Sequence, residues 1–204
     1  MSDRDLARAR RTLMRRDQRL AAVMKQHGRC GLADFRTHEP FASLVRTIVS
    51  QQLSGKAAET IHRRVLALVG GRETLTPDAI LALDTSALRG AGLSGQKVTY
   101  VLDLAHRVKT GALDLETLDQ LDDEAVVTAI TAVKGLGRWS AEMFLMFRLN
   151  RPDIFPVGDL GIVKGMQRLH GMKSRPAPRT MIRLAEPWRP FRSVAAWYLW
   201  RITE

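Results

Sequence analysis

Cysteine is almost absent from this sequence of 204 residues, where Cys30 is the only one. A single cysteine excludes an internal disulfide and any zinc or iron–sulfur site built from several cysteines. Long apolar runs are lacking too: the longest uncharged one, Ala125–Val133, is far below the roughly 20 residues of a membrane helix. The N-terminus is charged from its third residue and shows no apolar signal-peptide core. We therefore expect a soluble intracellular protein without a membrane partner, and a monomer by default.

Strand signals are also lacking, because no run alternates cleanly with period 2 and the β-branched residues are scattered. Helix signals recur instead. Ser54 can cap a helix over 55–68, and Thr76 followed by Pro77 can open a short helix to about Leu83. The other predicted helices span 86–89, 96–109, 124–132, 140–149, 160–169 and 193–200. The sequence predicts an all-α protein of eight to ten helices, with a loop at 171–179.

Acidic residues are few relative to basic ones: 21 Asp and Glu stand against 32 Lys and Arg, which gives a net charge of +11. The basic residues gather in the first thirty positions and in 164–192, whereas 113–124 is acidic. A surplus of this size attracts polyanions, and nucleic acid is the commonest polyanion in a cell. The alternative is an arginine-rich surface that is merely solvated.

Two glycine patterns need an interpretation. Residues 90–95, GAGLSG, match the dinucleotide fingerprint GxGxxG, but that fingerprint requires a preceding strand, and a short helix is predicted there. The second pattern, VKGLGRWSAEMF at 133–144, lies between two predicted helices. Gly135 and Gly137 permit positive φ and a close approach of the backbone to another molecule. Amides at the start of the next helix then favour a phosphate, although an ordinary helix–helix connection would use similar glycines.

The segment VKGLGRWSAEMFLMFRLNRPDIFPVGDLGIVKG, residues 133–165, resembles the helix–hairpin–helix (HhH-GPD) DNA glycosylase superfamily, and within it the 3-methyladenine DNA glycosylase II family. The resemblance extends to PFASLVRTIVSQQLSGKAA (40–58) and WRPFRSVAAWYLW (188–200), so it covers about residues 36–202. It implies a single glycosylase domain over 1–204, with two helical lobes flanking a cleft and the hairpin at 133–137. Longer relatives carry an N-terminal β domain, which we expect to be absent here because too few residues precede the matching region.

The resemblance implies base excision repair of double-stranded DNA, in the bacterial cytoplasm at the nucleoid or in a eukaryotic nucleus. Alkylated purines such as 3-methyladenine and 7-methylguanine would be flipped out and their N-glycosidic bonds hydrolysed. Related glycosylase/lyases carry a lysine nucleophile where this sequence has Trp139, so we expect a monofunctional enzyme without lyase activity. Two alternatives remain open: a non-catalytic helix–hairpin–helix DNA-binding module, and a glycosylase for another class of lesion.

The family's catalytic aspartate corresponds to Asp159, in the segment PVGDLG. Cleavage of an N-glycosidic bond makes the sugar oxocarbenium-like, and a nearby carboxylate stabilises that charge or helps water attack. The alternative is that Asp159 only caps the helix that begins at Leu160. One carboxylate can perform both roles.

Two tryptophans are candidates for the base pocket. Alkylation at a ring nitrogen makes the purine cationic, and the electron-rich indoles of Trp139 and Trp200 would attract it by a cation–π interaction. Core packing is the alternative for both, and it is the assignment for Trp188 and Trp197. Met143 stands where some family members have tyrosine, which predicts a more apolar pocket.

The flipped base leaves a gap in the stack, and the resemblance places the side chain that fills it in the turn after the IVSQ helix, at Gln52 or Leu53. A buried position in the turn is the alternative for Leu53. The expected phosphate contacts are main-chain amides and added positive charge around the hairpin: the amides of Gly135, Gly137 and Ser140, and the side chains of Lys134 and Arg138. Family hairpins also hold a monovalent cation on main-chain carbonyls, which implies Na⁺ or K⁺ on those of Thr131, Val133 and Leu136. No other cofactor is implied.

Overall fold

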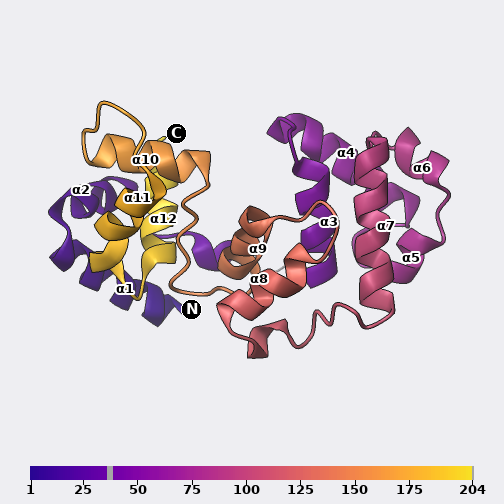
Figure 1. Cartoon of the computed structure of the whole chain (residues 1–204), viewed down its shortest axis with the longest axis horizontal. Coiled ribbons are helices and arrows are strands. Elements are labelled where there is room, and N and C mark those ends of the chain that lie inside the picture. Colours follow the sequence, from indigo (N-terminus) through magenta and orange to yellow (C-terminus); the bar gives the residue numbers. More distant parts are fainter. Residues whose placement is uncertain (36–38, 204) are drawn as a thin grey trace. The chain divides into compact units, whose positions relative to one another are not determined.

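The computed structural model describes residues 1–35 and 39–203, and over these residues it contains helices and connecting segments but no strand. The prediction of an all-α fold is confirmed. The chain divides into two compact units (Figure 1): unit 1 consists of Met1–Thr37 and Leu145–Glu204, and unit 2 of His38–Phe144. Residues 36–38, with which the resembling region was predicted to begin, lie outside the described residues. The cleft between two lobes stays a prediction.

Unit 2 is organised around two helices, α3 and α7. The helices of this unit are α3 (Pro40–Ser50), α4 (Gly55–Leu68), α5 (Pro77–Leu81), α6 (Thr85–Gly90), α7 (Gly95–Lys109), α8 (Asp123–Thr131) and α9 (Arg138–Met143), with a short 3₁₀ turn η2 (Leu118–Gln120). Most of α3 is buried, because its apolar residues recur every three to four positions and face α4 and α7. α7 packs on α3, α5 and α6 (Figure 1), so it joins the first helix of this unit to the two short helices that follow α4.

Unit 1 is organised around the C-terminal helix. Its helices are α1 (Asp3–Arg16), α2 (Gln18–His27), α10 (Leu160–Leu169), α11 (Pro178–Ala185) and α12 (Arg192–Arg201), with 3₁₀ turns η1 (Leu32–Phe35) and η4 (Glu186–Trp188). Ser193–Leu199 is buried all round, as expected of a helix that packs on several others. α10, α2 and α1 each contact α12 (Figure 1). The core of the unit therefore fixes the start of α10 relative to the end of α12.

Side-chain caps set the helix starts that the sequence predicted. The hydroxyls of Ser54 and Thr76 accept from the amides of Ala57 and Ala79, and α4 and α5 begin at the next residue. Helices predicted over 96–109, 124–132, 160–169 and 193–200 appear with bounds shifted by one residue at most. Residues 90–95 form the corner between α6 and α7, as expected of a connection and not of a nucleotide fingerprint.

The predicted number of helices was too low, because the described residues form twelve α-helices. The sequence interpretation missed α1, α2 and α11, and the predicted loop at 171–179 ends at Ala177 because Pro178 opens α11. The helix predicted over 140–149 was also wrong in detail: α9 covers Arg138–Met143, and a π-helical segment, η3 (Phe144–Arg148), continues it. Within the described residues, no helix combines the length and apolar character needed to cross a membrane.

Candidate functional site

Asp159 is the N-cap of α10, and its carboxylate carries two hydrogen bonds on one oxygen. The Ile162 amide donates to Oδ1 at 2.9 Å, and the Trp200 indole Nε1 donates to the same Oδ1 at 2.8 Å. The first bond satisfies an amide that the helix leaves without a partner. The second comes from α12, 41 residues away in sequence. The capping role proposed as an alternative is therefore present, and it is joined by a contact that helix capping does not require.

Trp200 is half-buried and held from two sides. Its ring stacks on Phe147, with centroids 5.6 Å apart and an angle of 22° between the planes. Gly161, close to Asp159 at the start of α10, passes so near that a Cβ there would lie 2.6 Å from the indole Cδ1. The small residue lets the indole reach the carboxylate, so the structure brings together two of the predicted site residues, Asp159 and Trp200, within unit 1.

The other tryptophans differ in burial. Trp188 is fully buried, and Trp197 is 8% exposed, so packing is confirmed for both. Trp139, on α9, is 44% exposed, which makes it one of the large apolar side chains that face solvent. Met143, at the end of α9, is half-buried. Trp139 and Met143 lie in unit 2, and their place in one pocket with Trp200 stays a prediction.

The hairpin glycines differ from each other. Gly135 has φ +79°, and a Cβ there would collide with the ring of Tyr100. Gly137 has φ −100°, so it does not use the positive φ that glycine permits. Gly137 is the N-cap of α9, a Cβ added to it would meet no heavy atom within 4 Å, and no side chain caps the helix in the described part of the chain. The space before α9 is open to an approaching group.

Charge around the hairpin is partly compensated. The Arg138 guanidinium pairs with Glu124, with one nitrogen 3.0 Å from a carboxylate oxygen, and lies 3.3 Å from Glu142. The hydrogen bond to Glu124 raises the pKa of Arg138. The Lys134 side chain is exposed, whereas Ser140 is 3% exposed. Little of Ser140 is therefore accessible for the predicted phosphate contact, and the exposed Lys134 provides the less compensated charge.

The turn between α3 and α4 presents both candidate wedge residues. Gln52 is exposed and has φ +56°, a left-handed conformation that is uncommon for a residue other than glycine. Leu53 is 39% exposed, so the alternative of a buried position in the turn is wrong. Both Gln52 and Leu53 are therefore on the surface, where either side chain could enter the DNA stack.

Four residues that hold this turn and the hairpin were missed by the sequence interpretation. Lys97 Nζ donates to two carbonyls at the end of α3, and Gln51 Nε2 donates to the Gly135 carbonyl at 2.7 Å. Tyr100 lies against Gly135, and Asp103 accepts the Lys134 amide at 2.9 Å. These contacts join segments 31 to 84 residues apart, so no local sequence signal could have found them.

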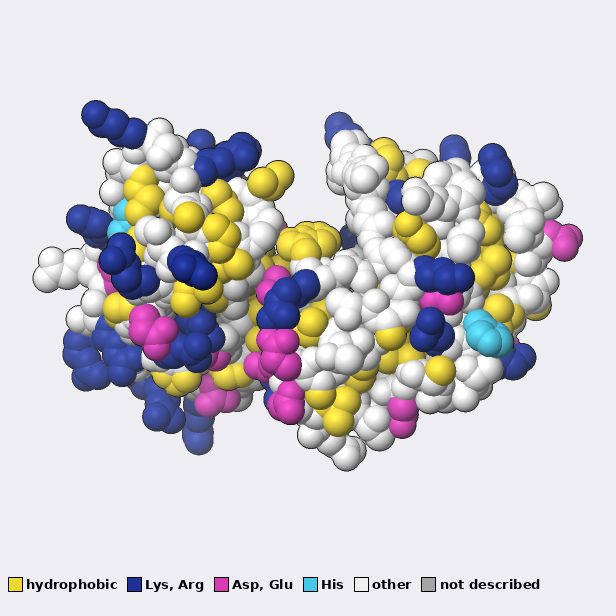
Figure 2. All heavy atoms as spheres, in the orientation of Figure 1, with side chains coloured by type: hydrophobic (Ala, Val, Ile, Leu, Met, Phe, Trp, Pro, Cys, Tyr) yellow, Lys and Arg dark blue, Asp and Glu magenta, His cyan; other side chains and the backbone are white. Residues whose placement is uncertain are grey.

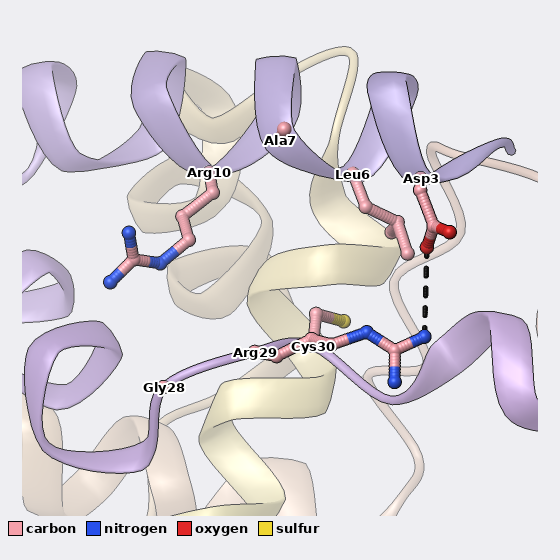
Figure 3. Close-up of a pocket in the computed structure, with 7 residues that line it drawn as sticks. All are labelled: Asp3, Leu6, Ala7, Arg10, Gly28, Arg29 and Cys30. Atoms are coloured by element: carbon pink, nitrogen blue, oxygen red, sulfur yellow. Dashed lines mark ion pairs between the residues drawn. The ribbon is translucent and has the colours of Figure 1, made fainter.

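A pocket of about 500 Å³ lies in unit 1, and its lining includes none of the predicted site residues. It is lined by α1 and the segment after α2 (Figure 3): Asp3, Leu6, Ala7, Arg10, Gly28, Arg29 and Cys30. Burial raises the pKa of the Cys30 thiol to about 12, which keeps it protonated and unreactive. Within the described residues, no group of three or more His, Cys, Asp and Glu side chains could hold a metal ion.

Comparisons with known proteins agree with the all-helical fold. The family model described as HhH-GPD superfamily base excision DNA repair protein matches residues 45–190. The chain is 35% identical over 167 residues to DNA-3-methyladenine glycosylase 1 of Schizosaccharomyces pombe, over 81% of this chain and 73% of that protein. A solved structure of the S. pombe 3-methyladenine DNA glycosylase in complex with abasic DNA superposes with a TM-score of 0.86 at 32% identity, over 96% of each chain. A DNA-3-methyladenine glycosidase from Bacillus halodurans gives a TM-score of 0.83 at 38% identity, over 93% of this chain and 86% of that one.

Proposed function

The chain belongs to the HhH-GPD superfamily of base excision DNA repair proteins, and on that premise we propose that it is a monofunctional DNA glycosylase for alkylated purines. It hydrolyses the N-glycosidic bond of bases such as 3-methyladenine and 7-methylguanine in double-stranded DNA after flipping them out of the stack. The observation that carries the proposal is the hydrogen bond from Trp200 Nε1 to Asp159 Oδ1. It holds a carboxylate in one orientation beside an aromatic ring.

Asp159 acts on the sugar. As the bond from C1′ to the base nitrogen breaks, positive charge develops on the sugar ring, and a fixed carboxylate stabilises it better than mobile water does. The same carboxylate can orient the water that then attacks C1′. The alkylated base leaves as a neutral molecule because it is already cationic while attached. The reaction therefore does not require a strong general acid.

Trp200 and Trp139 would receive the base. The Trp200 ring is steadied by Phe147 on the π-helical continuation of α9, and Trp139 presents an exposed indole. Stacking of a cationic purine on an indole gains a cation–π interaction of about 0.5–2 kcal/mol that an unmodified base does not gain. Met143, which lies on α9 with Trp139, would make the predicted pocket more apolar. Preference for alkylated over normal purines follows from that difference in charge.

The absence of lyase activity rests on position 139. The related glycosylase/lyases use a lysine amine there to form a Schiff base with the sugar, and an indole cannot do so. Lys134 is separated from this position by the hairpin glycines, and its backbone amide is held by Asp103. We therefore expect hydrolysis to leave an abasic site in an intact strand.

DNA contact is assigned to the hairpin and to the turn after α3. The uncapped start of α9 offers amides to a phosphate, and Lys134 adds charge. Gln52 or Leu53 fills the gap left by the flipped base. The resemblance implies a monovalent cation on hairpin carbonyls: Thr131 ends α8, where a helix leaves carbonyls without partners inside it, whereas the Val133 carbonyl already accepts the Leu136 amide at 3.1 Å. The carbonyls of Thr131, Val133 and Leu136 would hold Na⁺ or K⁺, which would add positive charge beside the phosphate.

The test is base release from methylated duplex DNA under single-turnover conditions, with Asp159→Asn as the matched variant. The asparagine Oδ1 can still accept from Ile162 and Trp200, and asparagine is as good an N-cap as aspartate, so the fold should persist. We expect release of methylated purines by the wild type, a loss of at least about 100-fold in the variant, and strands that stay intact until alkali is added.

Three results would contradict parts of this proposal. Equal release by wild type and Asp159→Asn would remove Asp159 from the chemistry. Strand breaks before alkali would contradict the monofunctional reaction. Tight DNA binding without release of any methylated base would favour the non-catalytic module, or a glycosylase whose substrate is an uncharged lesion.

A further inference from the structure

The turn between α3 and α4 is held by a lysine from another helix. Lys97 Nζ donates to the carbonyl oxygens of Val49 and Gln51, both at 2.7 Å. These carbonyls lie at the C-terminal end of α3, where a helix leaves carbonyls without partners and carries the negative end of its dipole. An ammonium group is well matched to that position. The last turn of α3 and the first residue of the following turn are therefore fixed by one side chain.

The position of Lys97 in its own helix is unfavourable. Lys97 is the third residue of α7, at the end that carries the positive part of the helix dipole. Lys97 is also half-buried, and this burial lowers the pKa of its ammonium group. A lysine here does not stabilise α7. Its contacts with the two carbonyls of α3 are what account for its presence.

The same turn is joined to the hairpin at 133–137. Gln51 Nε2 donates to the Gly135 carbonyl at 2.7 Å. Gly135 in turn lies against Tyr100, and Asp103 Oδ2 accepts the Lys134 amide at 2.9 Å. Lys97, Tyr100 and Asp103 follow one another at intervals of three in α7, so they lie along neighbouring positions of its surface. One helix thus contacts both segments that are assigned to DNA.

We propose that Lys97 is a positioning residue, assisted by Gln51, which holds the wedge turn in register with the phosphate-binding hairpin. The inference rests on the proposed function, because it concerns the side chain that replaces the flipped base. Gln52 has a left-handed backbone, which is strained for a glutamine. A turn already held in this conformation needs no ordering when DNA binds, so less of the binding free energy is spent on it.

The experiment measures insertion of the wedge separately from chemistry. The probe is a duplex with a tetrahydrofuran abasic analogue flanked by 2-aminopurine, mixed with protein in a stopped-flow fluorimeter. Lys97→Met removes the donors and keeps most of the side-chain length. We expect insertion and single-turnover base release to slow by about 10- to 100-fold, as for a misplacement of roughly 1 Å. Affinity for undamaged duplex should change by less than about twofold, because the hairpin amides and Lys134 are untouched.

Two variants serve as matched comparisons. Lys97→Arg can still donate to both carbonyls and should restore most of the insertion rate. Lys109→Met removes the same charge from the other end of α7, where Lys109 pairs with exposed Asp78, and should behave as wild type. If Lys97→Met does not fold, Gln51→Met removes only the contact with Gly135 and should slow insertion in the same way.

Several outcomes would overturn the inference. One is wild-type insertion by Lys97→Met, or by Gln51→Met where the lysine variant does not fold. Another is an equal loss of insertion and of affinity for undamaged duplex, which would indicate a general structural role. A wild-type protein that binds the abasic duplex without any fluorescence change would show that this turn inserts nothing. A fluorescence change without release of methylated bases would contradict the proposed substrate and leave Lys97 as a positioning residue.

Discussion

At the scale of single residues, the hydrogen bond between Trp200 and Asp159 can be removed while an aromatic ring stays at position 200 and the carboxylate stays at position 159. Trp200→Phe keeps an aromatic ring against Phe147 and deletes the indole N–H. Asp159 then loses one of the two donors to Oδ1 and is oriented less well, so we expect kcat for base release to fall by about tenfold or more with a smaller change in KM. Single-turnover and steady-state assays on methylated duplex separate the two effects.

Trp197→Phe is the control for that variant. It makes the same chemical change in the same helix, at an indole that packs beside Tyr198 and under Arg201 instead of contacting Asp159. It should lower thermal stability and leave the rate of base release per folded molecule unchanged. A normal kcat in Trp200→Phe would mean that the indole N–H does not position the carboxylate.

Sequence reasoning reached Asp159 and Trp200 separately but not the contact between them. The carboxylate and its helix start are local features, whereas the hydrogen bond to Trp200 spans 41 residues and depends on Gly161 being small enough to admit the indole. The left-handed Gln52 has no local signal either, because glutamine is not a residue type that favours this conformation. Such details come from tertiary packing, which composition and spacing do not encode directly.

At the scale of elements, the two hairpin glycines predict opposite outcomes. Gly137→Ala places a Cβ in open space at φ −100°, so the free energy of unfolding should change by less than about 0.5 kcal/mol. The added methyl group stands where a phosphate would approach, and affinity for damaged and undamaged duplex should fall alike. Thermal melts and duplex titrations test both statements, and unchanged affinity with an unchanged salt dependence would exclude the start of α9 as a phosphate site.

Gly135→Ala should destabilise the fold itself and not only weaken DNA binding. Its φ of +79° is strained for alanine, and the new Cβ would collide with the Tyr100 ring. We expect a loss of stability of at least about 1–3 kcal/mol, measured by denaturant unfolding. Wild-type stability of this variant would mean that the hairpin can move away from α7, which would also weaken the argument that α7 fixes the hairpin.

Asp103 links α7 to the hairpin in a way that depends on pH. Burial raises the pKa of its carboxyl, but the Lys134 amide and Arg107 outweigh burial, so the pKa lies below the ordinary value. Because the folded state has the lower pKa, the stabilisation is present above the unfolded pKa of about 3.9 and is lost as pH falls through the folded value. Asp103→Ala should cost about 1–2 kcal/mol at pH 7.

Unfolding by urea at a series of pH values tests this prediction. The difference between wild type and Asp103→Ala should be constant from about pH 7 to 5 and shrink below about pH 4. Asp84→Ala, at an exposed carboxylate outside α7 that forms no side-chain capping hydrogen bond with α6, is the control and should leave the free energy of unfolding close to that of the wild type. A difference that persists at low pH would mean that packing of the side chain, and not its charge, supports the hairpin.

The elements themselves were predictable where a cap or an apolar period marked them. Ser54, Thr76 and Asp159 each start a helix at the predicted residue because capping is a local interaction. α1 carries an equally local capping box between Ser2 and Asp5. Its buried stripe of Leu6, Ala9 and Leu13 is interrupted by many arginines, so the apolar period is weak in the sequence. α11 has no side-chain cap and follows a segment that contains the helix breakers Gly171 and Pro176, so no local signal marks its start.

At the scale of the whole molecule, the net charge of +11 is unevenly distributed. Figure 2 shows Lys and Arg side chains crowded over unit 1. The basic residues of α1 include Arg4, Arg8, Arg11 and Arg15, which are all exposed and are spaced so that they share one side of the helix. Like charges at this spacing destabilise a helix slightly. These arginines therefore either create a positive electrostatic field that attracts DNA, or form a solvated surface that has no part in binding.

A field of this kind acts on the rate of encounter more than on the bound state. Replacing these four arginines of α1 by glutamine should reduce the association rate with duplex DNA several-fold at low salt. The rates should converge near 1 M salt, where the Debye length is about 3 Å. Base release at saturating DNA should not change, because none of the four arginines belongs to the proposed site. Stopped-flow association at several salt concentrations gives both rates.

Lys134→Gln provides the contrast, because it removes a charge that is proposed to touch a phosphate. Loss of one phosphate contact should make the slope of log Kobs against log salt less negative by about 0.9. The association rate should change less than in the α1 variant. If the α1 variant instead lowers that slope by several units, its arginines bind phosphates directly and α1 belongs to the DNA interface. If neither its rate nor its slope changes, the basic surface of α1 is solvated and takes no part in binding. The two measurements together separate long-range attraction from contact, which net charge alone cannot do.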